Sequence, residues 1–289
     1  MWSLERRPQI LDFYVRRIFR IYPLAMVTVL GVVLFRMPLV GTVADPFRPF
    51  HPTIKLTFAN LLLLQNLLRQ PNAEGVLWSL PLEVQMYIVL PALFLLARKE
   101  EALWPFLVLW GLAVGVVHGC LPRGTGNNLM TVVPDFLPGI LAYVGFRRHP
   151  TTLPTWLFPV LLAALCVGFV LRPSMPVGWI LCLLLGLALP HFRQSGNRKI
   201  NLSSHTIAKY SYGIYLLHPW SILLAFHVLR GRPLALQLAV EMVSLAVLAV
   251  TAYHLIEHPL IRVGSRTANL LQRRYDQRSH AEEPGLELA

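Results

Sequence analysis

The sequence predicts an all-α integral membrane protein, a polytopic helical bundle with about eight spans. Three observations predict this fold class. Only 14% of the 289 residues are charged and 55% are hydrophobic, whereas soluble domains carry about 25% charged residues. The mean hydropathy is +0.54. The apolar residues also gather into runs close to the ~20 residues that a helix needs to cross a bilayer.

Eight apolar runs are each expected to form one span. They cover residues 21–40, 78–97, 103–121, 129–146, 154–171, 177–192, 210–228 and 235–257. A further run, 56–68, is shorter and contains Asn60, Gln65 and Asn66. A helix of this length is about 18 Å long, short of the ~30 Å hydrocarbon core. We expect this segment to be re-entrant or to lie at the membrane surface.

The basic residues predict the orientation. If the 56–68 run does not cross, 18 of the 26 Lys and Arg residues lie on the side that holds both termini. The positive-inside rule assigns that side to the cytoplasm, so a multi-pass protein of the inner (plasma) membrane is expected. Residues 1–20 are then a basic cytoplasmic entry segment and 21–262 the membrane domain. Residues 263–289 form a polar cytoplasmic tail, expected to be partly disordered.

Charge and cysteine usage narrow the possible partners. The net charge is +12, but the basic residues lie in loops and no basic patch is interleaved with aromatic residues, so no nucleic acid partner is expected. Cys120, Cys166 and Cys182 lack CxxC or metal-ligand spacing. Neither a disulfide framework nor a metal site is expected.

Three arginines precede the first span. Arg16 and Arg17 lie four and three residues before Arg20, so one helical turn gathers their guanidinium groups. Such a cluster is suited to binding phosphates with bidentate geometry. The alternative is a topology anchor whose side chains extend to lipid headgroups.

Glu83 lies near the start of the 78–97 run. A carboxylate in hydrocarbon costs several kcal/mol, roughly 3 on the insertion scale, and is therefore a functional candidate. Ser79, Glu83 and Tyr87 share one helix face by their i, i+4, i+8 spacing. The alternative is a structural carboxylate that is hydrogen-bonded between helices.

Two further polar sets occur in later spans. Ser211, Tyr215 and His218 have i, i+4, i+7 spacing, and Pro219 follows them. A proline at this point frees a backbone carbonyl and bends the helix, an irregularity suited to a cavity, although a packing histidine is the alternative.

The last set precedes Pro259. His254, Glu257 and His258 share a face. No third strong ligand is evident for a metal. The more specific hypothesis is that the Glu257 carboxylate orients a neighbouring imidazole for proton transfer.

Together these motifs resemble acyltransferase family 3, the bacterial polytopic membrane O-acyltransferases that modify cell-surface sugars. The segment 16–23 resembles its Arg-x-x-Arg element. Residues 78–87 resemble its Trp-Ser-Leu-x-x-Glu-x-x-Phe-Tyr signature, with Met86 at the aromatic position. Residues 210–219 resemble its Ser-Tyr-x-x-Tyr-Leu-x-His element, and Glu257-x-Pro259 its closing Glu-x-Pro. The four matches occur in the family's order.

The resemblance implies a membrane O-acyltransferase that moves an acyl group, commonly acetyl, from a cytoplasmic acyl-CoA. Its acceptor is a hydroxyl of a cell-surface or secreted glycan or of a lipid-linked sugar, presented from the other side. The implied site residues are Arg16, Arg17 and Arg20 for the donor; Glu83, His218 and Glu257 for catalysis; and Trp78, Ser79, Tyr87, Ser211 and Tyr215 for substrate binding.

The sequence departs from the family pattern at its start. The family normally begins with two further spans, which carry an arginine and a histidine regarded as the catalytic base. Here Met1 is followed directly by the arginines of the first set, so a shortened copy is expected and the base is left unassigned. The alternatives are a transporter or flippase for a polar lipid-linked substrate, and an inactive homologue.

Overall fold

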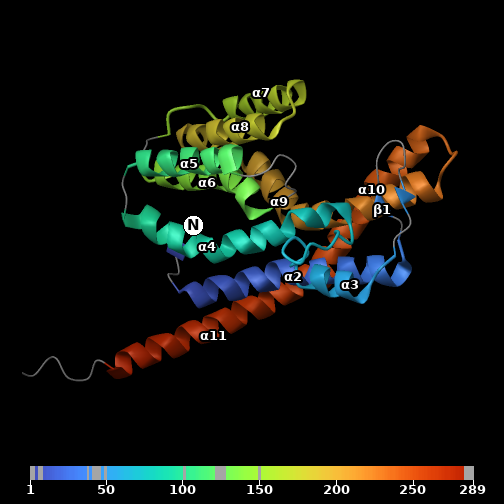
Figure 1. The fold of residues 1–289 in the computed structure, drawn as a ribbon, viewed down its shortest axis with the longest axis horizontal. Coiled ribbons are helices and arrows are strands. Elements are labelled where there is room, and N and C mark those ends of the chain that lie inside the picture. The colour runs from blue at the N-terminus through green and yellow to red at the C-terminus, as the bar shows by residue number, and fades with distance from the viewer. Residues whose placement is uncertain are drawn as a thin grey trace, which may run out of the picture. The chain divides into compact units, whose positions relative to one another are not determined.

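The computed structural model describes residues 4–5, 9–37, 39–40, 47–48, 51–99, 102–120, 128–148 and 151–282. Helices dominate it (Figure 1). The α-helices are α2 (Ile10–Phe35), α3 (Ile54–Leu61), α4 (Leu80–Lys99), α5 (Trp104–Cys120), α6 (Leu129–Phe146), α7 (Leu157–Leu171), α8 (Met175–Ala188), α9 (Arg198–Ile222), α10 (Leu234–Ala252) and α11 (His258–Glu282).

Several short elements complete the fold. Two are 3-10 helices, η1 (Gly75–Trp78) and η2 (Leu189–His191). Two are π-helices, η3 (Leu223–Val228) and η4 (Tyr253–Glu257). The strands β1 (Leu39–Val40) and β2 (Phe47–Arg48) pair antiparallel over two residues each. π-Helical turns are rare and occur frequently at functional sites.

The prediction of a helical protein with membrane-spanning helices is confirmed. Within the described residues, four helical stretches are long and apolar enough to cross a membrane: Ile10–Phe35, Gly75–Lys99, Leu129–Phe146 and Leu234–Arg273. Three shorter apolar helices cover Trp104–Gly119, Leu157–Leu171 and Met175–His191. The predicted count of about eight spans is not confirmed. Helices α5, α7 and α8 are shorter than the ~20 residues that a span needs. The first half of α9 is polar and contains Lys199 and Lys209.

The 56–68 run forms a short helix followed by turns. Helix α3 has only 8 residues, which corresponds to about 12 Å. The buried Asn60 ties the chain after α3 back onto the helix, because its Nδ2 donates to the carbonyls of Leu56 and Pro71, and its Oδ1 accepts from the Ala73 N–H. This segment therefore contains no helix long enough to cross a bilayer.

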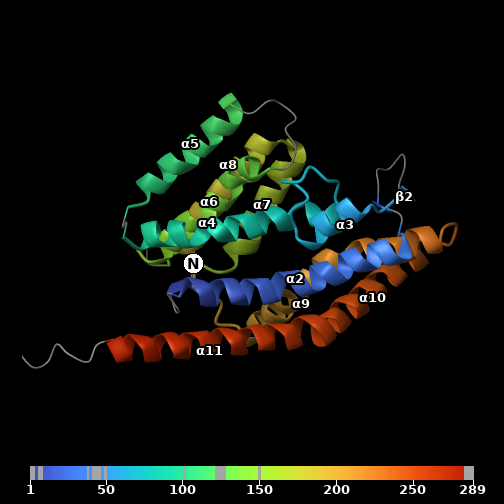
Figure 2. The same cartoon turned by 60° about the horizontal axis from the view of Figure 1, so that its bottom comes forward.

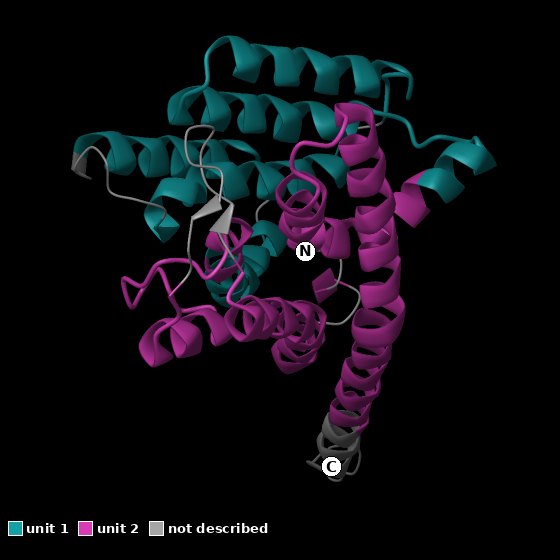
Figure 3. Ribbon diagram, turned by 90° about the vertical axis from the view of Figure 1, so that its right-hand side faces the viewer, with its two compact units in different colours: residues 1–2, 82–203 teal, residues 3–81, 204–289 magenta. Residues whose placement is uncertain are grey.

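The described chain separates into two compact units (Figure 3). The first contains residues 82–203, and the second contains residues 3–81 and 204–289. In the first unit α6 packs against α5 and α8. Gly186 allows the closest approach, since a Cβ there would lie 2.5 Å from the Pro138 carbonyl oxygen.

Replacing Gly186 with alanine is expected to destabilise the first unit by roughly 1–3 kcal/mol, because a backbone oxygen cannot move aside as a flexible side chain can. Thermal unfolding in detergent measures the effect. Gly139→Ala is the matched control, since no atom lies within 4 Å of a Cβ at that neighbouring α6 position. Equal melting temperatures for the two variants would contradict this packing argument.

In the second unit α2 and α11 run side by side, as both ribbon views show (Figures 1 and 2). Gly264 of α11 faces the Phe19 side chain, where a Cβ would lie 2.5 Å from that of Phe19. Helix α9 is joined to α2 by the Tyr212 hydroxyl, which donates to the Ile21 carbonyl at 2.6 Å.

Neither predicted domain boundary coincides with the end of a helix. The first, after residue 20, falls within α2, and the second, after residue 262, falls within α11. Residues 263–282 continue helix α11. Residues 283–289 of the predicted tail lie outside the described part of the chain.

Candidate functional site

His218 is held in one tautomer by the proline that follows it. Pro219 has no N–H, so the carbonyl of Tyr215, four residues earlier, lacks its helical donor. His218 Nδ1 lies 2.8 Å from this carbonyl oxygen. Because a carbonyl can only accept, Nδ1 carries a proton and donates it to this oxygen. When the ring has a single proton, that proton lies at Nδ1, and Nε2 of this half-buried side chain can accept one.

The hydroxyl of Tyr215 connects α9 to η1. It donates to the Val76 carbonyl at 2.7 Å and lies 2.7 Å from Ser79 Oγ. Since a phenol has one proton, Ser79 is the donor in the second bond. The Tyr215 and His218 rings lie 6.2 Å apart between centroids. Ser79, Tyr215 and His218 are therefore brought together within the second unit.

Two substrate-binding candidates point elsewhere. Ser211 is exposed, and its hydroxyl donates to the Ala208 carbonyl of its own helix. Trp78 is 41% exposed at the end of η1. The spacing rule placed Ser211 on the Tyr215 stripe, but the structure does not bring its hydroxyl to the Ser79 contact.

Glu83 and Tyr87 form a pair within the first unit. The Tyr87 hydroxyl donates to Glu83 Oε1 across one turn of α4, and both side chains are partly buried. The i, i+4 spacing on one helix face lets the two side chains meet. Glu83 is therefore hydrogen-bonded along its own helix.

Glu257 is the deepest of the three predicted carboxylate and imidazole groups. It ends the π-helix η4 and is 3% exposed, and its Oε1 has no hydrogen-bond partner among the described residues. Gly213 makes room for it, since a Cβ there would lie 3.2 Å from that oxygen. Arg20 is the positive charge that acts on Glu257. The structure thus links a predicted donor-binding arginine to a predicted catalytic carboxylate.

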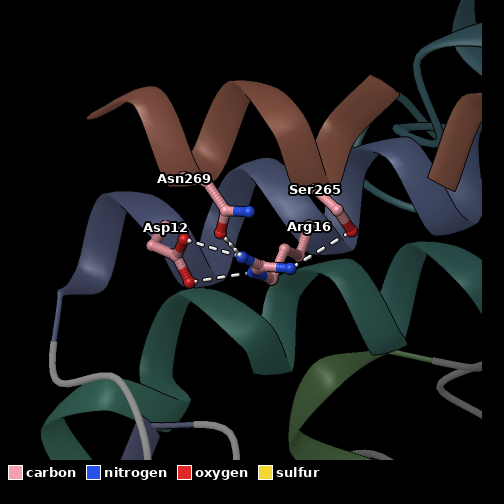
Figure 4. Close-up of polar contacts among 4 residues, drawn as sticks. All are labelled: Asp12, Arg16, Ser265 and Asn269. Atoms are coloured by element: carbon pink, nitrogen blue, oxygen red, sulfur yellow. Dashed lines mark hydrogen bonds and ion pairs between the residues drawn. The ribbon is translucent and has the colours of Figure 1, made fainter. Parts of the chain in front are cut away.

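Arg16 binds polar side chains of its own helix, α2, and of α11 (Figure 4). Its Nε and Nη2 donate to the two carboxylate oxygens of the buried Asp12, at 2.9 and 3.2 Å. Its Nη1 donates to Ser265 at 3.1 Å and its Nη2 to Asn269 at 2.9 Å. These bonds join α2 to α11. The guanidinium of Arg17 lies over the Phe13 ring, and Arg20 is exposed.

The histidines near Glu257 belong to an aromatic cluster. Tyr253 stacks on His258 with centroids 5.6 Å apart, and the Lys209 ammonium lies 4.6 Å from the Tyr253 centroid. His254 Nε2 lies 3.3 Å from the Tyr210 hydroxyl. Among the residues described, no group of three or more His, Cys, Asp or Glu is placed to hold a metal ion.

The structure also reveals buried polar residues that sequence reasoning missed. Glu74 is 6% exposed, and its Oε2 has no partner in the described part of the chain. Burial raises the pKa of Glu74 to about 8, and the nearby Trp220 indole acts in the opposite direction. Gln65 Nε2 donates to the Leu77 carbonyl at 3.1 Å. Glu74 follows a polar stretch typical of a solvated loop, so no sequence signal distinguishes it.

Comparisons with known proteins agree with the predicted family. A family model described as "Acyltransferase domain" matches residues 1–256. A curated protein, Acyltransferase MdmB from Streptomyces mycarofaciens, is 27% identical over 185 residues. That alignment covers 61% of this chain and 43% of the relative, so the chain spans less than half of the relative's length. No solved structure matches.

Proposed function

Because the chain belongs to acyltransferase family 3, we propose that it is a membrane O-acyltransferase. It transfers an acyl group, acetyl in the simplest case, from a cytoplasmic acyl-CoA to a hydroxyl of a cell-surface or secreted glycan. The observation that carries the proposal is His218, whose Nδ1 is bound to the carbonyl freed by Pro219, which leaves Nε2 free to accept a proton.

The reaction needs one proton acceptor. The acceptor hydroxyl oxygen attacks the thioester carbonyl carbon while its proton moves to His218 Nε2. The carbon–sulfur bond then breaks, and the thiolate leaves and takes up a proton. Tyr215, fixed by Val76 and Ser79, supports the ring of His218 from one side. Glu83 and Tyr87 line the side from which the acceptor enters. Glu257 and Arg20 lie along the path through the protein interior.

The proposed orientation places the donor in the cytoplasm. Both termini and the α2 arginines face the cytoplasm of an inner membrane protein, and the 56–68 segment stays on the opposite side. The phosphates of the acyl-CoA then meet Arg17 and Arg20. Arg16 contributes by holding α2 against α11 through its bonds to Asp12, Ser265 and Asn269.

The test is transfer of label from [14C]acetyl-CoA to glycan acceptors by the protein reconstituted in proteoliposomes. Release of CoA coupled to an acetylated acceptor is the expected result. Movement of an acceptor across the membrane without acetyl transfer would point to a transporter and would contradict the proposal.

Replacing Arg20 with alanine is expected to weaken acyl-CoA binding about tenfold, because a charge-assisted phosphate contact is lost. The variant should still fold, since Arg20 is exposed, and its melting temperature should fall only as far as the loss of a positive charge near Glu257 requires. Calorimetric titration with CoA measures the affinity. The matched variant is Arg16→Ala, which should lower the melting temperature because the buried Asp12 carboxylate loses its guanidinium partner. Equal CoA affinity in wild type and Arg20→Ala would refute the donor role.

A further inference from the structure

The second unit contains a group of basic and aromatic side chains where α9, η4 and α11 meet. We call this group the Lys209 cluster: Lys209, Tyr210, Tyr253, His254, His258 and Arg262. The charges of Arg262, His254 and Lys209 all act on His258. Within the described part of the chain, none of Lys209, His258 and Arg262 forms an ion pair with a carboxylate. Like charges repel one another, so an anion would stabilise this cluster.

The carboxylate nearest in sequence, Glu257, does not supply that anion. Its side chain is 3% exposed and lies against Gly213, where a Cβ would lie 3.2 Å from Glu257 Oε1. Arg20 on α2 is the charge that acts on it. Arg16 has a carboxylate of its own in Asp12. The fold thus pairs charges on the α2 side of α11, whereas the Lys209 cluster is left for a group from outside the described chain.

Two aromatic rings hold the Lys209 ammonium in place. It lies 4.8 Å from the Tyr210 centroid and 4.6 Å from the Tyr253 centroid, and the two rings meet edge-on at 5.2 Å. Both distances are typical of cation–π contacts. Tyr253 also stacks on His258, with 27° between the ring planes. An anion that binds there meets a charge that is already positioned, which lowers the entropy cost of binding.

The Lys209 cluster lies where the last apolar run ends. The helical stretch Leu234–Arg273 contains 40 residues, which corresponds to about 60 Å, twice the thickness of a hydrocarbon core. Its apolar part, residues 235–257, is about 35 Å long and ends directly before His258. Tyrosine, lysine and arginine side chains gather at this level of membrane proteins, next to the lipid headgroups.

Apolar side chains next to the cluster favour a lipid over a soluble anion. Ile207 lies two residues before Lys209, Leu255 follows His254 directly, and both apolar side chains are largely exposed. Lipid acyl chains would cover them, whereas inorganic phosphate or CoA would not. A zwitterionic headgroup carries its own ammonium beside the phosphate and brings no net charge. An anionic phospholipid is therefore the class of ligand that fits.

We propose that the Lys209 cluster binds the headgroup phosphate of an anionic phospholipid. The Lys209 ammonium and the Arg262 guanidinium donate charge-assisted hydrogen bonds to the phosphate oxygens, and His258 donates a ring N–H. The acyl chains lie along Ile207 and Leu255. The bound lipid joins α9 to α11 within the second unit. This inference concerns lipid binding and does not depend on acyl transfer.

The test is native mass spectrometry of the protein in detergent that contains phosphatidylglycerol or phosphatidylcholine with identical acyl chains. The wild type should retain phosphatidylglycerol with an affinity at least about tenfold above that for phosphatidylcholine. Lys209→Gln and Arg262→Gln should each weaken phosphatidylglycerol binding about tenfold, since each removes a charge-assisted hydrogen bond.

The matched controls remove the same charge elsewhere on the same helices. Lys199→Gln on α9 and Arg273→Gln on α11 change exposed side chains, and both variants should bind phosphatidylglycerol within about twofold of the wild type. Equal losses in Lys209→Gln and Lys199→Gln, or equal affinity of the wild type for the two lipids, would overturn the inference, because general surface charge would then account for the binding.

A further pair of variants tests the cluster without changing the net charge. Tyr253→Leu removes a ring that holds Lys209 and should weaken phosphatidylglycerol binding roughly fivefold. Tyr253→Phe keeps the ring and should bind as the wild type does. Wild-type affinity in Tyr253→Leu would contradict the role of the ring in positioning the ammonium.

Competition with CoA separates the two sources of a phosphate group. Saturating CoA should leave bound phosphatidylglycerol in place. Displacement of the lipid by CoA, together with weaker CoA binding in Lys209→Gln, would assign the cluster to the acyl donor and overturn the lipid site. Selective lipid binding by a protein that transfers no acetyl group would contradict the proposed function alone, and acetyl transfer without selective lipid binding would overturn this inference alone.

Discussion

Replacing His218 with glutamine is expected to lower acyl transfer by roughly two to four orders of magnitude, the usual contribution of a positioned general base. Glutamine can still donate an N–H to the Tyr215 carbonyl, so the bend at Pro219 is preserved. It cannot accept the proton of the attacking hydroxyl. The initial rate of [14C]acetyl transfer in proteoliposomes measures the loss.

His205→Gln is the matched control for this experiment. His205 lies on the same helix, α9, and its side chain is exposed. Its rate should stay within twofold of the wild type, and the melting temperature of both variants should be unchanged. Transfer by His218→Gln at more than a tenth of the wild-type rate would remove His218 from the role of base.

Replacing Glu74 with glutamine is expected to stabilise the protein at neutral pH and to flatten its stability against pH. The pKa of Glu74 is about 8 in the folded protein, against an ordinary value of 4.5 that applies when the chain unfolds. Between these values the folded state keeps a proton that the unfolded state has released. Stability is therefore greatest below pH 4.5 and falls as the pH rises toward 8.

At pH 7 this single group lowers the free energy of unfolding of the wild type by roughly 3 kcal/mol, since each pKa unit corresponds to about 1.4 kcal/mol. Melting temperatures in detergent between pH 5 and pH 8.5 measure the effect. The wild-type curve should slope downward more steeply than that of Glu74→Gln, and Glu241→Gln should follow the wild type. Parallel curves for wild type and Glu74→Gln would show that Glu74 ionises normally.

Features governed by local rules were predictable from the sequence. Apolar run length predicted a helical membrane protein, and the missing N–H of Pro219 predicted a free carbonyl next to His218. The i, i+4 spacing predicted that Glu83 and Tyr87 share one helix face, where they form a hydrogen bond. These outcomes depend on backbone chemistry within one helical turn, so neighbouring elements did not alter them.

Features that depend on packing were not predictable in the same way. Arg16 and Arg20 look alike in sequence, yet only Arg16 meets the buried Asp12 and the polar side chains of α11. Ser211 has the right spacing but faces outward. Glu74 follows a polar loop and is nonetheless buried, because α9 brings Trp220 against it. The count of about eight spans is not confirmed either, since several apolar runs form helices shorter than the runs themselves.

The bonds from Arg16 to Ser265 and Asn269 have a consequence for biosynthesis. The Arg16–Ser265 pair is separated by 249 residues of chain. At about 5–20 residues per second, α2 emerges from the ribosome some tens of seconds before α11 exists to cover it. During that interval Asp12 and the apolar face of α2 must be shielded by lipid, by the insertion machinery or by helices made earlier. The second unit is therefore completed only after the first has been translated. Until then α2 lacks its partner α11, and it is the helix most exposed to misfolding during assembly.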